Sequence, residues 1–216
     1  MAFQQEKKLS TTPDHPRWPS VVFVLILMTL ITFGATIPFY YESQSLWYKF
    51  GIDKTLLRTG KIIGNTTAIF LLLQLVPTVR LPFLVATLGV KKLLFLHKIT
   101  GVLLFLFGLT HATLILLPEG LGNLPIGKKY WPEMVGMSLL FVFFLQVFFG
   151  LFRQHLGLSY RRWRIPHKLI GYFSLALLWF HVPFVSESFQ HTVPLTAFIV
   201  ITVILVSVIG FIKLRP

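Results

Sequence analysis

The 216-residue sequence contains no cysteine and few acidic residues. Disulfides and thiolate metal ligands are therefore excluded, and any protein ligand to a metal must be an imidazole nitrogen or an oxygen. Seven aspartates and glutamates stand against twenty lysines and arginines, and only 12% of the chain is charged. Hydrophobic residues make up 55% of the chain and the mean hydropathy is +0.75, unlike a soluble globular domain. We therefore expect a membrane protein.

Long apolar runs predict an all-α membrane protein built as a six-transmembrane-helix bundle. Each run has about twenty residues, enough for a helix to cross a hydrocarbon core of roughly 30 Å. The predicted spans are 20–40, 60–79, 93–117, 132–152, 166–185 and 193–213. We expect one domain over 20–216, preceded by a short segment, 1–19. Because no small-residue cleavage site follows the first apolar run, it is predicted to be a retained anchor.

The placement of basic residues predicts that both termini are cytoplasmic. Twelve lysines and arginines lie in the predicted inner segments, against six in the outer ones. The inner segments are 1–19, 80–92, 153–164 and 213–216, and the outer ones are 41–61 and 118–130. Attraction to anionic lipid in the bilayer explains most of the net charge of +13 without nucleic acid. The expected location is the plasma membrane, or the inner membrane of a bacterium.

Two of the apolar spans repeat one pattern of polar residues. In each, a histidine is followed by lysine, by glycine four positions on, and by a second histidine fourteen positions on. The repeated residues are His97, Lys98, Gly101 and His111 in the third span, and His167, Lys168, Gly171 and His181 in the fifth. Fourteen helical residues rise about 21 Å in nearly four turns, so both histidines lie close to one face. Ionisable groups within a membrane are costly and usually face an interior site or partner.

The repeated histidines predict two b-type haems stacked across the membrane. If the two parallel spans face each other, His97 meets His167 near the cytoplasm, and His111 meets His181 on the far side. Two axial imidazoles give a six-coordinate iron suited to electron transfer, and sites about 20 Å apart bring the macrocycle edges within tunnelling range. The glycines four positions after the inner histidines would let a flat macrocycle approach each helix. A single histidine in a span often only bonds a neighbouring helix, but the repeat favours ligation.

Cations near the two sites could offset the haem propionates. Lys98, Lys168, Arg162 and Arg164 lie at the predicted inner level, and Arg58 and Lys61 at the outer level. Snorkelling and the inside-positive bias account for an individual lysine equally well. The other histidines, His15, His155 and His191, fall in predicted loops and are assigned to the surface.

The histidine pattern resembles the ferric-reductase-like transmembrane domain of NADPH oxidases and ferric reductases. That family has six spans, of which the third and fifth each carry two haem-ligating histidines. Residues 58–80, RTGKIIGNTTAIFLLLQLVPTVR, resemble the family's second helix, and 160–169, YRRWRIPHKL, resemble the basic loop before the fifth span. The resemblance implies an oxidoreductase that carries electrons from a cytoplasmic flavin dehydrogenase to oxygen, giving superoxide, or to a ferric chelate. It also implies a role for Arg58 on the acceptor side.

Two departures from the family qualify these expectations. No flavin or Gly-rich dinucleotide motif is present, so FAD and NADPH are expected only in a partner subunit or in a missing C-terminal domain. Animal superoxide-producing oxidases have a further histidine one turn beyond the outer ligand, where this chain has Ile115, so the acceptor stays open. The expected docking surface comprises two basic loops, with Arg80, Lys91 and Lys92 in one and Arg153, Arg161, Arg162 and Arg164 in the other.

Two other functions fit parts of the sequence. The chain could be a haem subunit that exchanges electrons with quinone or with a periplasmic redox enzyme. It could instead be a transporter whose intramembrane histidines relay protons or bind a transition metal directly. A transporter should have broken helices and acidic partners within its spans, and Glu133 is the only carboxylate expected inside one.

Overall fold

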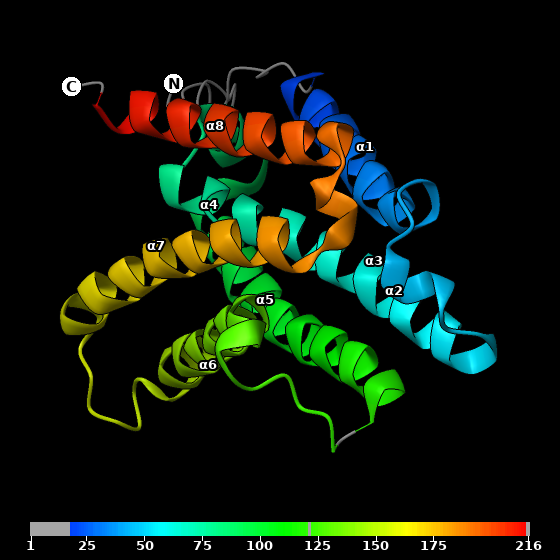
Figure 1. The fold of residues 1–216 in the computed structure, drawn as a ribbon. Coiled ribbons are helices and arrows are strands. Elements are labelled where there is room, and N and C mark those ends of the chain that lie inside the picture. Colours follow the sequence, from blue (N-terminus) through cyan, green and yellow to red (C-terminus); the bar gives the residue numbers. More distant parts are fainter. Residues whose placement is uncertain (1–17, 121, 215–216) are drawn as a thin grey trace, which may run out of the picture.

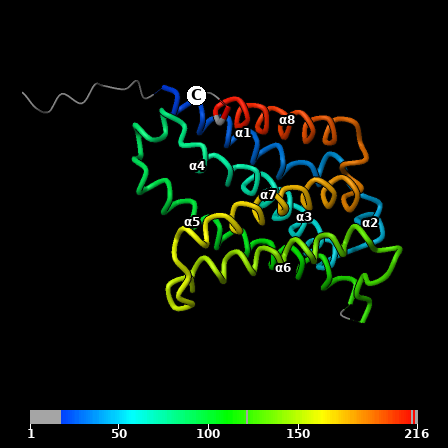
Figure 2. Tube along the Cα trace, turned by 90° about the vertical axis from the view of Figure 1, so that its left-hand side faces the viewer, coloured from blue at the N-terminus to red at the C-terminus, as the bar shows by residue number. Residues whose placement is uncertain are grey.

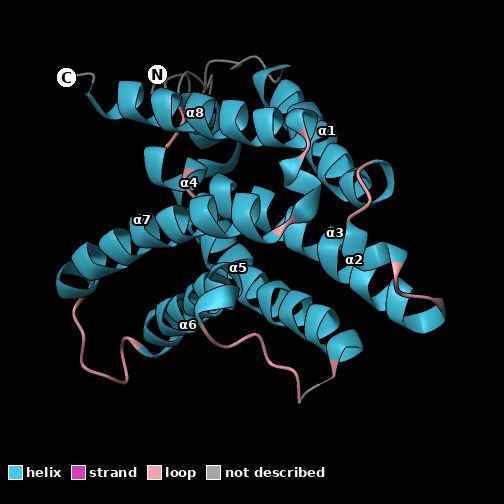
Figure 3. Cartoon of the chain, in the orientation of Figure 1, coloured by secondary structure: helices cyan, strands magenta, loops and turns pink. Residues whose placement is uncertain are grey.

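Helices make up nearly all of the regular structure in this computed structural model, which describes residues 18–120 and 122–214 (Figure 3). Six helices are long and apolar enough to cross a membrane: α1 (Trp18–Tyr40), α3 (Gly51–Leu73), α5 (Pro82–Leu116), α6 (Trp131–Phe152), α7 (Tyr160–Val185) and α8 (Thr192–Leu214). Short helical segments join them: α2 (Gln44–Trp47), α4 (Val76–Val79), η2 (Leu117–Glu119), η3 (Lys128–Tyr130) and η4 (Glu187–Gln190). The prediction of an all-helical protein with six candidate spans is confirmed. The predicted N-terminal segment lies, up to residue 17, outside the described residues.

The long helices run back and forth between two ends of the bundle (Figures 1 and 2). One end holds the start of α1, the α4–α5 junction, the α6–α7 connection and the end of α8; α2 and the start of α8 lie at the other (Figure 2). We call these the inner and outer ends, after the predicted topology. The two predicted docking segments both lie at the inner end.

Two antiparallel helix pairs form the centre of the bundle. The most extensive packing joins α3 to α5 and α6 to α7, while α1 covers α3. The central core is apolar and includes Leu71, Leu72, Leu139, Phe143 and Leu178. Many large apolar side chains elsewhere on the long helices are exposed, as lipid-facing positions should be.

All six helices begin earlier than predicted, three of them by six residues or more. These three are α3, which begins at Gly51 instead of 60, α5, which begins at Pro82 instead of 93, and α7, which begins at Tyr160 instead of 166. The spans were predicted from the lengths of the apolar runs. A helix can continue beyond such a run as long as its backbone hydrogen bonds are made and its end is capped. Pro82 occupies the first turn of α5, and the Ser159 hydroxyl accepts from the Arg162 backbone N–H at 3.4 Å.

The early starts correct the predicted basic loops. Lys91, Lys92 and three of the four arginines of the second segment lie on helices, so neither segment is simply a loop. The helix α5 is broken once, at Gly89, where φ is 73° and ψ is 155°. That backbone conformation is accessible almost only to glycine, so a glycine is required at the break.

Candidate functional site

The four repeated histidines form two pairs between α5 and α7. At the inner end the rings of His97 and His167 are 6.0 Å apart between centroids, with their planes at 85°. At the outer end His111 and His181 are 6.5 Å apart, with their planes at 81°. Fourteen helical residues, a rise of about 21 Å, separate the two pairs on each helix. We call them the inner pair and the outer pair.

The separation within each pair fits a single iron atom between the rings. An imidazole nitrogen binds a first-row metal at about 2 Å and lies about 1 Å from its ring centre, so two axial imidazoles are centred about 6 Å apart. Both pairs meet this requirement. Within 18–120 and 122–214, no three or more histidines and acidic residues are grouped so that they could hold a metal ion. Two imidazoles suit a haem, whose macrocycle supplies the remaining four donors.

The outer pair is oriented by two backbone carbonyls. Nδ1 of His111 lies 2.8 Å from the carbonyl oxygen of Gly60 on α3, and Nδ1 of His181 lies 3.1 Å from that of Pro132 on α6. A carbonyl only accepts hydrogen bonds, so each Nδ1 carries the proton and each Nε2 keeps its lone pair. Histidines that bind metals are commonly fixed by such a bond from the second nitrogen.

Two glycines make room for the outer imidazoles. A Cβ at Gly64 would lie 2.6 Å from the ring of His111, and one at Gly136 would lie 2.4 Å from the ring of His181. Neither distance is possible for a real side chain, so each ring occupies space that only glycine leaves free. Neither glycine was predicted from the sequence.

The inner pair borders a cavity of about 790 Å³. Gly101 and Gly171 line this cavity, and a Cβ at Gly101 would meet nothing within 4 Å. At Gly171 a Cβ would meet only Nε2 of Gln146, at 4.0 Å. The space beside both predicted glycines is therefore open, and its size is typical of a cofactor site.

Charged and aromatic groups also line the inner cavity. Lys98, Lys168 and Arg164 reach it, so three of the four cations predicted at the inner level border the cavity. Lys98 and Lys168 are themselves exposed. The ring of Trp163 lies 4.9 Å from that of His167.

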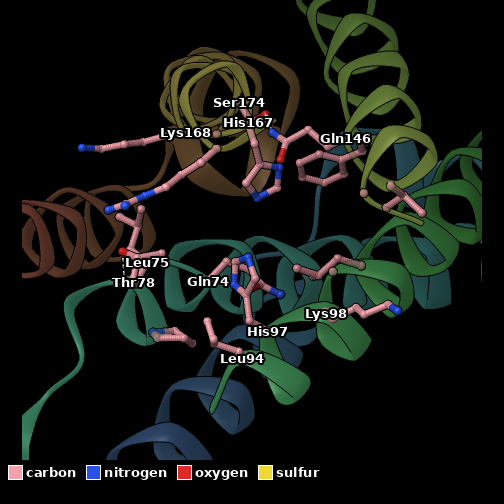
Figure 4. A pocket seen from close by; sticks show the side chains of 18 of the residues that line it. Gln74, Leu75, Thr78, Leu94, His97, Lys98, Gln146, His167, Lys168 and Ser174 are labelled. Carbon is pink, nitrogen blue, oxygen red and sulfur yellow. Dashed lines mark hydrogen bonds between the residues drawn. The ribbon is translucent and has the colours of Figure 1, made fainter. Parts of the chain in front are cut away.

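Two glutamines flank the inner pair and were not predicted from the sequence (Figure 4). Nε2 of Gln74, the residue that caps the end of α3, donates to the Thr100 hydroxyl on α5 at 2.6 Å. Nε2 of Gln146 on α6 donates to the Ser174 hydroxyl on α7 at 3.2 Å. Nδ1 of both inner histidines is buried without a hydrogen-bond partner, as is Oε1 of Gln74.

The internal repeat extends from the histidine helices to their partners. On α3 the residues facing the histidines are Gly60, Gly64 and Gln74; on α6 they are Pro132, Gly136 and Gln146. The offsets of four and ten residues are the same in both sets. Gln74 and Gln146 thus follow the carbonyls that hold the outer histidines by fourteen residues, the spacing of the histidines themselves. The repeated spacing of ten residues from glycine to glutamine was the sequence signal that could have revealed them.

Arg58 lies near the outer pair but is bound elsewhere. It sits on α3 two residues before Gly60, its guanidinium 2.5 Å from Oε1 of Glu42 and 5.0 Å from the ring centre of Phe39. Lys54 also pairs with Glu42, at 3.0 Å. The hydrogen bond from Lys54 lowers the pKa of Glu42, and Arg58 lowers it further, so the carboxylate is ionised at neutral pH. The guanidinium of Arg58 therefore contacts Glu42 and Phe39, not an imidazole.

Lys61 belongs to a second polar group at the outer end. Its Nζ donates to the hydroxyls of Ser43 and Ser45, and the Ser45 hydroxyl donates to Glu187 at 3.3 Å. This network joins the segment after α1 to α3 and η4. The two surface histidines that the structure describes, His155 and His191, are exposed as predicted, while His15 lies outside the described residues.

Six candidate spans and two stacked imidazole pairs define the class of this chain, a helical membrane protein with paired histidines between its spans. A sequence model of the family described as ferric reductase like transmembrane component matches residues 63–178. The match covers more than half of the chain, and the chain belongs to this family. Searches of curated proteins and of solved structures gave no match. Membership indicates transmembrane electron transfer and oxidoreductase activity in general terms.

Proposed function

We propose that the chain holds two b-type haems, one at the inner pair and one at the outer pair, and conducts electrons between the two faces of a membrane. The observation that carries this proposal is the separation of each pair, 6.0 Å and 6.5 Å between ring centres, which suits one iron between two axial imidazoles. Bound haem supplies one-electron redox chemistry, while the protein supplies ligands, spacing and surroundings.

The protein's own residues would orient the ligands and exclude water between the two sites. The outer imidazoles are held with Nε2 free by the carbonyls of Gly60 and Pro132. Leu104 and Ser174, each seven residues after an inner histidine, are 4% and 1% exposed. Packed side chains between the sites would exclude solvent from the path between them.

The same paired geometry argues against direct binding of a transition metal, the transporter alternative. Two imidazoles alone would leave such an ion short of protein ligands, whereas a haem iron needs only two. The break at Gly89 lies at the inner end of α5, before His97, and interrupts neither pair.

In the proposed orientation both termini face the cytoplasm, and residues 20–216 form the haem domain of a plasma-membrane or bacterial inner-membrane protein. FAD and NADPH would belong to a dehydrogenase subunit or domain at the inner end, and oxygen or a ferric chelate would accept electrons at the outer end. Arg58, paired with Glu42 beside the outer pair, is proposed to contribute on the acceptor side through its position.

The purified protein should show a low-spin b-type spectrum with two haems per chain. Two sites with two imidazoles each account for this stoichiometry. The measurement is the absorption spectrum with haem quantified against protein, after expression with haem supplementation. One haem per chain would contradict the assignment of two sites, and none would overturn the proposed function.

The chain should not oxidise NADPH by itself, and its basic inner end should dock the reductase that does. A nicotinamide delivers a two-electron hydride and a haem accepts one electron, so a flavin is needed between them. Arg161 and Arg162 are exposed in the first turn of α7. With a flavin reductase domain of this family and NADPH under anaerobic conditions, Arg161→Gln with Arg162→Gln should slow haem reduction by about tenfold at low salt, because charge complementarity mainly raises the association rate.

Lys128 and Lys129 provide the matched control for docking. They are an adjacent pair of basic residues at the outer end, in η3. Changing both to glutamine should leave haem reduction unaltered. Rapid reduction by NADPH without a flavoprotein would contradict the need for a flavin, and equal rates for the two double variants would remove the docking role from α7.

A further inference from the structure

The two histidine pairs differ in how their second nitrogen is held. Nδ1 of each outer histidine donates to a backbone carbonyl of the adjacent helix. Nδ1 of each inner histidine is buried without a hydrogen bond, and so is Oε1 of Gln74, although the backbone of Gln74 also interacts with His97. A buried donor and a buried acceptor are both costly when left unsatisfied, so unpaired groups that line the same cavity are candidates for one another.

The register of the helices places an acceptor opposite each inner histidine. Along α3, Gly60 faces His111, and the residue fourteen positions later is Gln74; α5 runs in the opposite direction from His97 to His111. Along α6, Pro132 faces His181, and the residue fourteen positions later is Gln146. Equal spacing on antiparallel neighbours brings each glutamine level with an inner histidine. Figure 4 shows Gln74 beside His97 and Gln146 beside His167.

Hydrogen bonds to helix carbonyls fix which end of each amide faces the imidazole. The Thr100 hydroxyl donates to the carbonyl of Leu96 at 2.7 Å, and the Ser174 hydroxyl donates to that of Ile170 at 2.9 Å. A hydroxyl has one proton, so each can only accept from its glutamine. Nε2 of each amide must therefore point to the hydroxyl, and Oε1 is left as the acceptor.

We propose that Gln74 and Gln146 are positioning residues of the inner site, whose side-chain oxygens accept from Nδ1 of His97 and His167 and so turn Nε2 of each toward the iron. This inference rests on the proposed function. Backbone carbonyls, which every residue has, would hold the outer imidazoles whatever the side chains are. At the inner site two side chains that can be substituted would set the reduction potential.

The proposal fixes the sign of an effect on the inner haem. An acceptor on Nδ1–H increases electron donation from the imidazole and favours ferric iron, so removing it should raise the reduction potential. Gln74→Leu or Gln146→Leu should change the ferric-to-ferrous equilibrium by about tenfold, which is about 59 mV upward for a one-electron couple. Gln74→Glu, with a more basic acceptor, should move the potential downward.

The test is a potentiometric titration of the α-band in purified full-length variants, resolved into two components. The outer component serves as an internal reference and should not move. Thr100→Val removes the hydroxyl that orients the amide but leaves the amide oxygen, so the inner potential should rise by less than in Gln74→Leu. A purely structural role would make Thr100→Val and Gln74→Leu alike and would not give opposite signs for leucine and glutamate.

Three outcomes decide the question. Opposite shifts of the inner component in the leucine and glutamate variants, with a smaller upward shift in Thr100→Val, support the proposal; loss of the inner haem in Gln74→Leu but not in Thr100→Val also supports it. An inner component that stays unmoved in both glutamine-to-leucine variants overturns the proposal and leaves the proposed function intact. Absence of haem from the wild-type protein overturns both.

Discussion

Alanine in place of His111 or His181 is expected to remove the outer haem and leave the inner haem reducible. Each haem would have only two protein ligands, so the loss of one leaves a single axial bond and an open coordination position. Haem content should fall from two per chain to one. Alanine in place of His97 or His167 should instead remove the inner haem and block electron arrival at the outer one. The measurements are haem quantification and anaerobic reduction by a flavin reductase.

The described surface histidines are the controls for this series. His155 and His191 are exposed, and His191 packs against the ring of Tyr41 at 5.4 Å. His155→Ala and His191→Ala should retain both haems. If alanine at one member of a pair eliminated the haem assigned to the other pair, the pairing would be wrong.

Histidine spacing was the part of the site that the sequence predicted best. Two histidines fourteen residues apart must lie near one face of any helix, so the pattern restricts the arrangement before the helices are placed. The distance across each pair depends on how α5 and α7 approach each other, and no pattern within one helix sets that distance. The structure supplies it.

The groups that hold the outer imidazoles could not be predicted from residue type. Their acceptors are backbone carbonyls of Gly60 and Pro132, and every residue has a carbonyl. Gln74 and Gln146 could have been found, because each follows a glycine by ten residues, Gly64 and Gly136, just before a histidine span. The starts of α5 and α7 were predicted too late. The length of an apolar run reflects the thickness of the membrane, whereas capping and backbone hydrogen bonding determine where a helix begins.

The extended repeat gives the two sites the same kind of ligands, but the groups around those ligands differ. Each unit is an antiparallel pair, α3 with α5 and α6 with α7, and each contributes one ligand to each site. Both sites therefore lie between the units. The outer site has glycine close approaches and carbonyl acceptors, and the inner site has open cavity and amides. Duplicated geometry thus supports two haem sites with different surroundings.

Alanine at Gly64 or at Gly136 is expected to displace an outer imidazole and to lower outer haem occupancy while sparing the inner haem. The added Cβ would lie 2.6 Å or 2.4 Å from the ring of His111 or His181. The ring cannot retreat freely, because its Nδ1 is bonded to a carbonyl of the same neighbouring helix. Overpacking of this kind costs about 1–3 kcal/mol, and loss of the Nδ1 bond adds about 1 kcal/mol. Haem content and the outer α-band component measure the effect.

Gly108 offers a matched control within the membrane. It lies on α5, three residues before His111, and a Cβ there would meet only Leu140 Cδ1 at 3.4 Å, an ordinary contact. Gly108→Ala should therefore keep both haems and wild-type thermal stability, whereas Gly64→Ala and Gly136→Ala should each reduce the outer haem specifically. A glycine effect on one haem is more informative than general destabilisation, because the substituted residue is no ligand and acts only through the position of the ring. Retention of both haems at wild-type potentials in Gly64→Ala and Gly136→Ala would show that the outer imidazoles do not need the space those glycines leave.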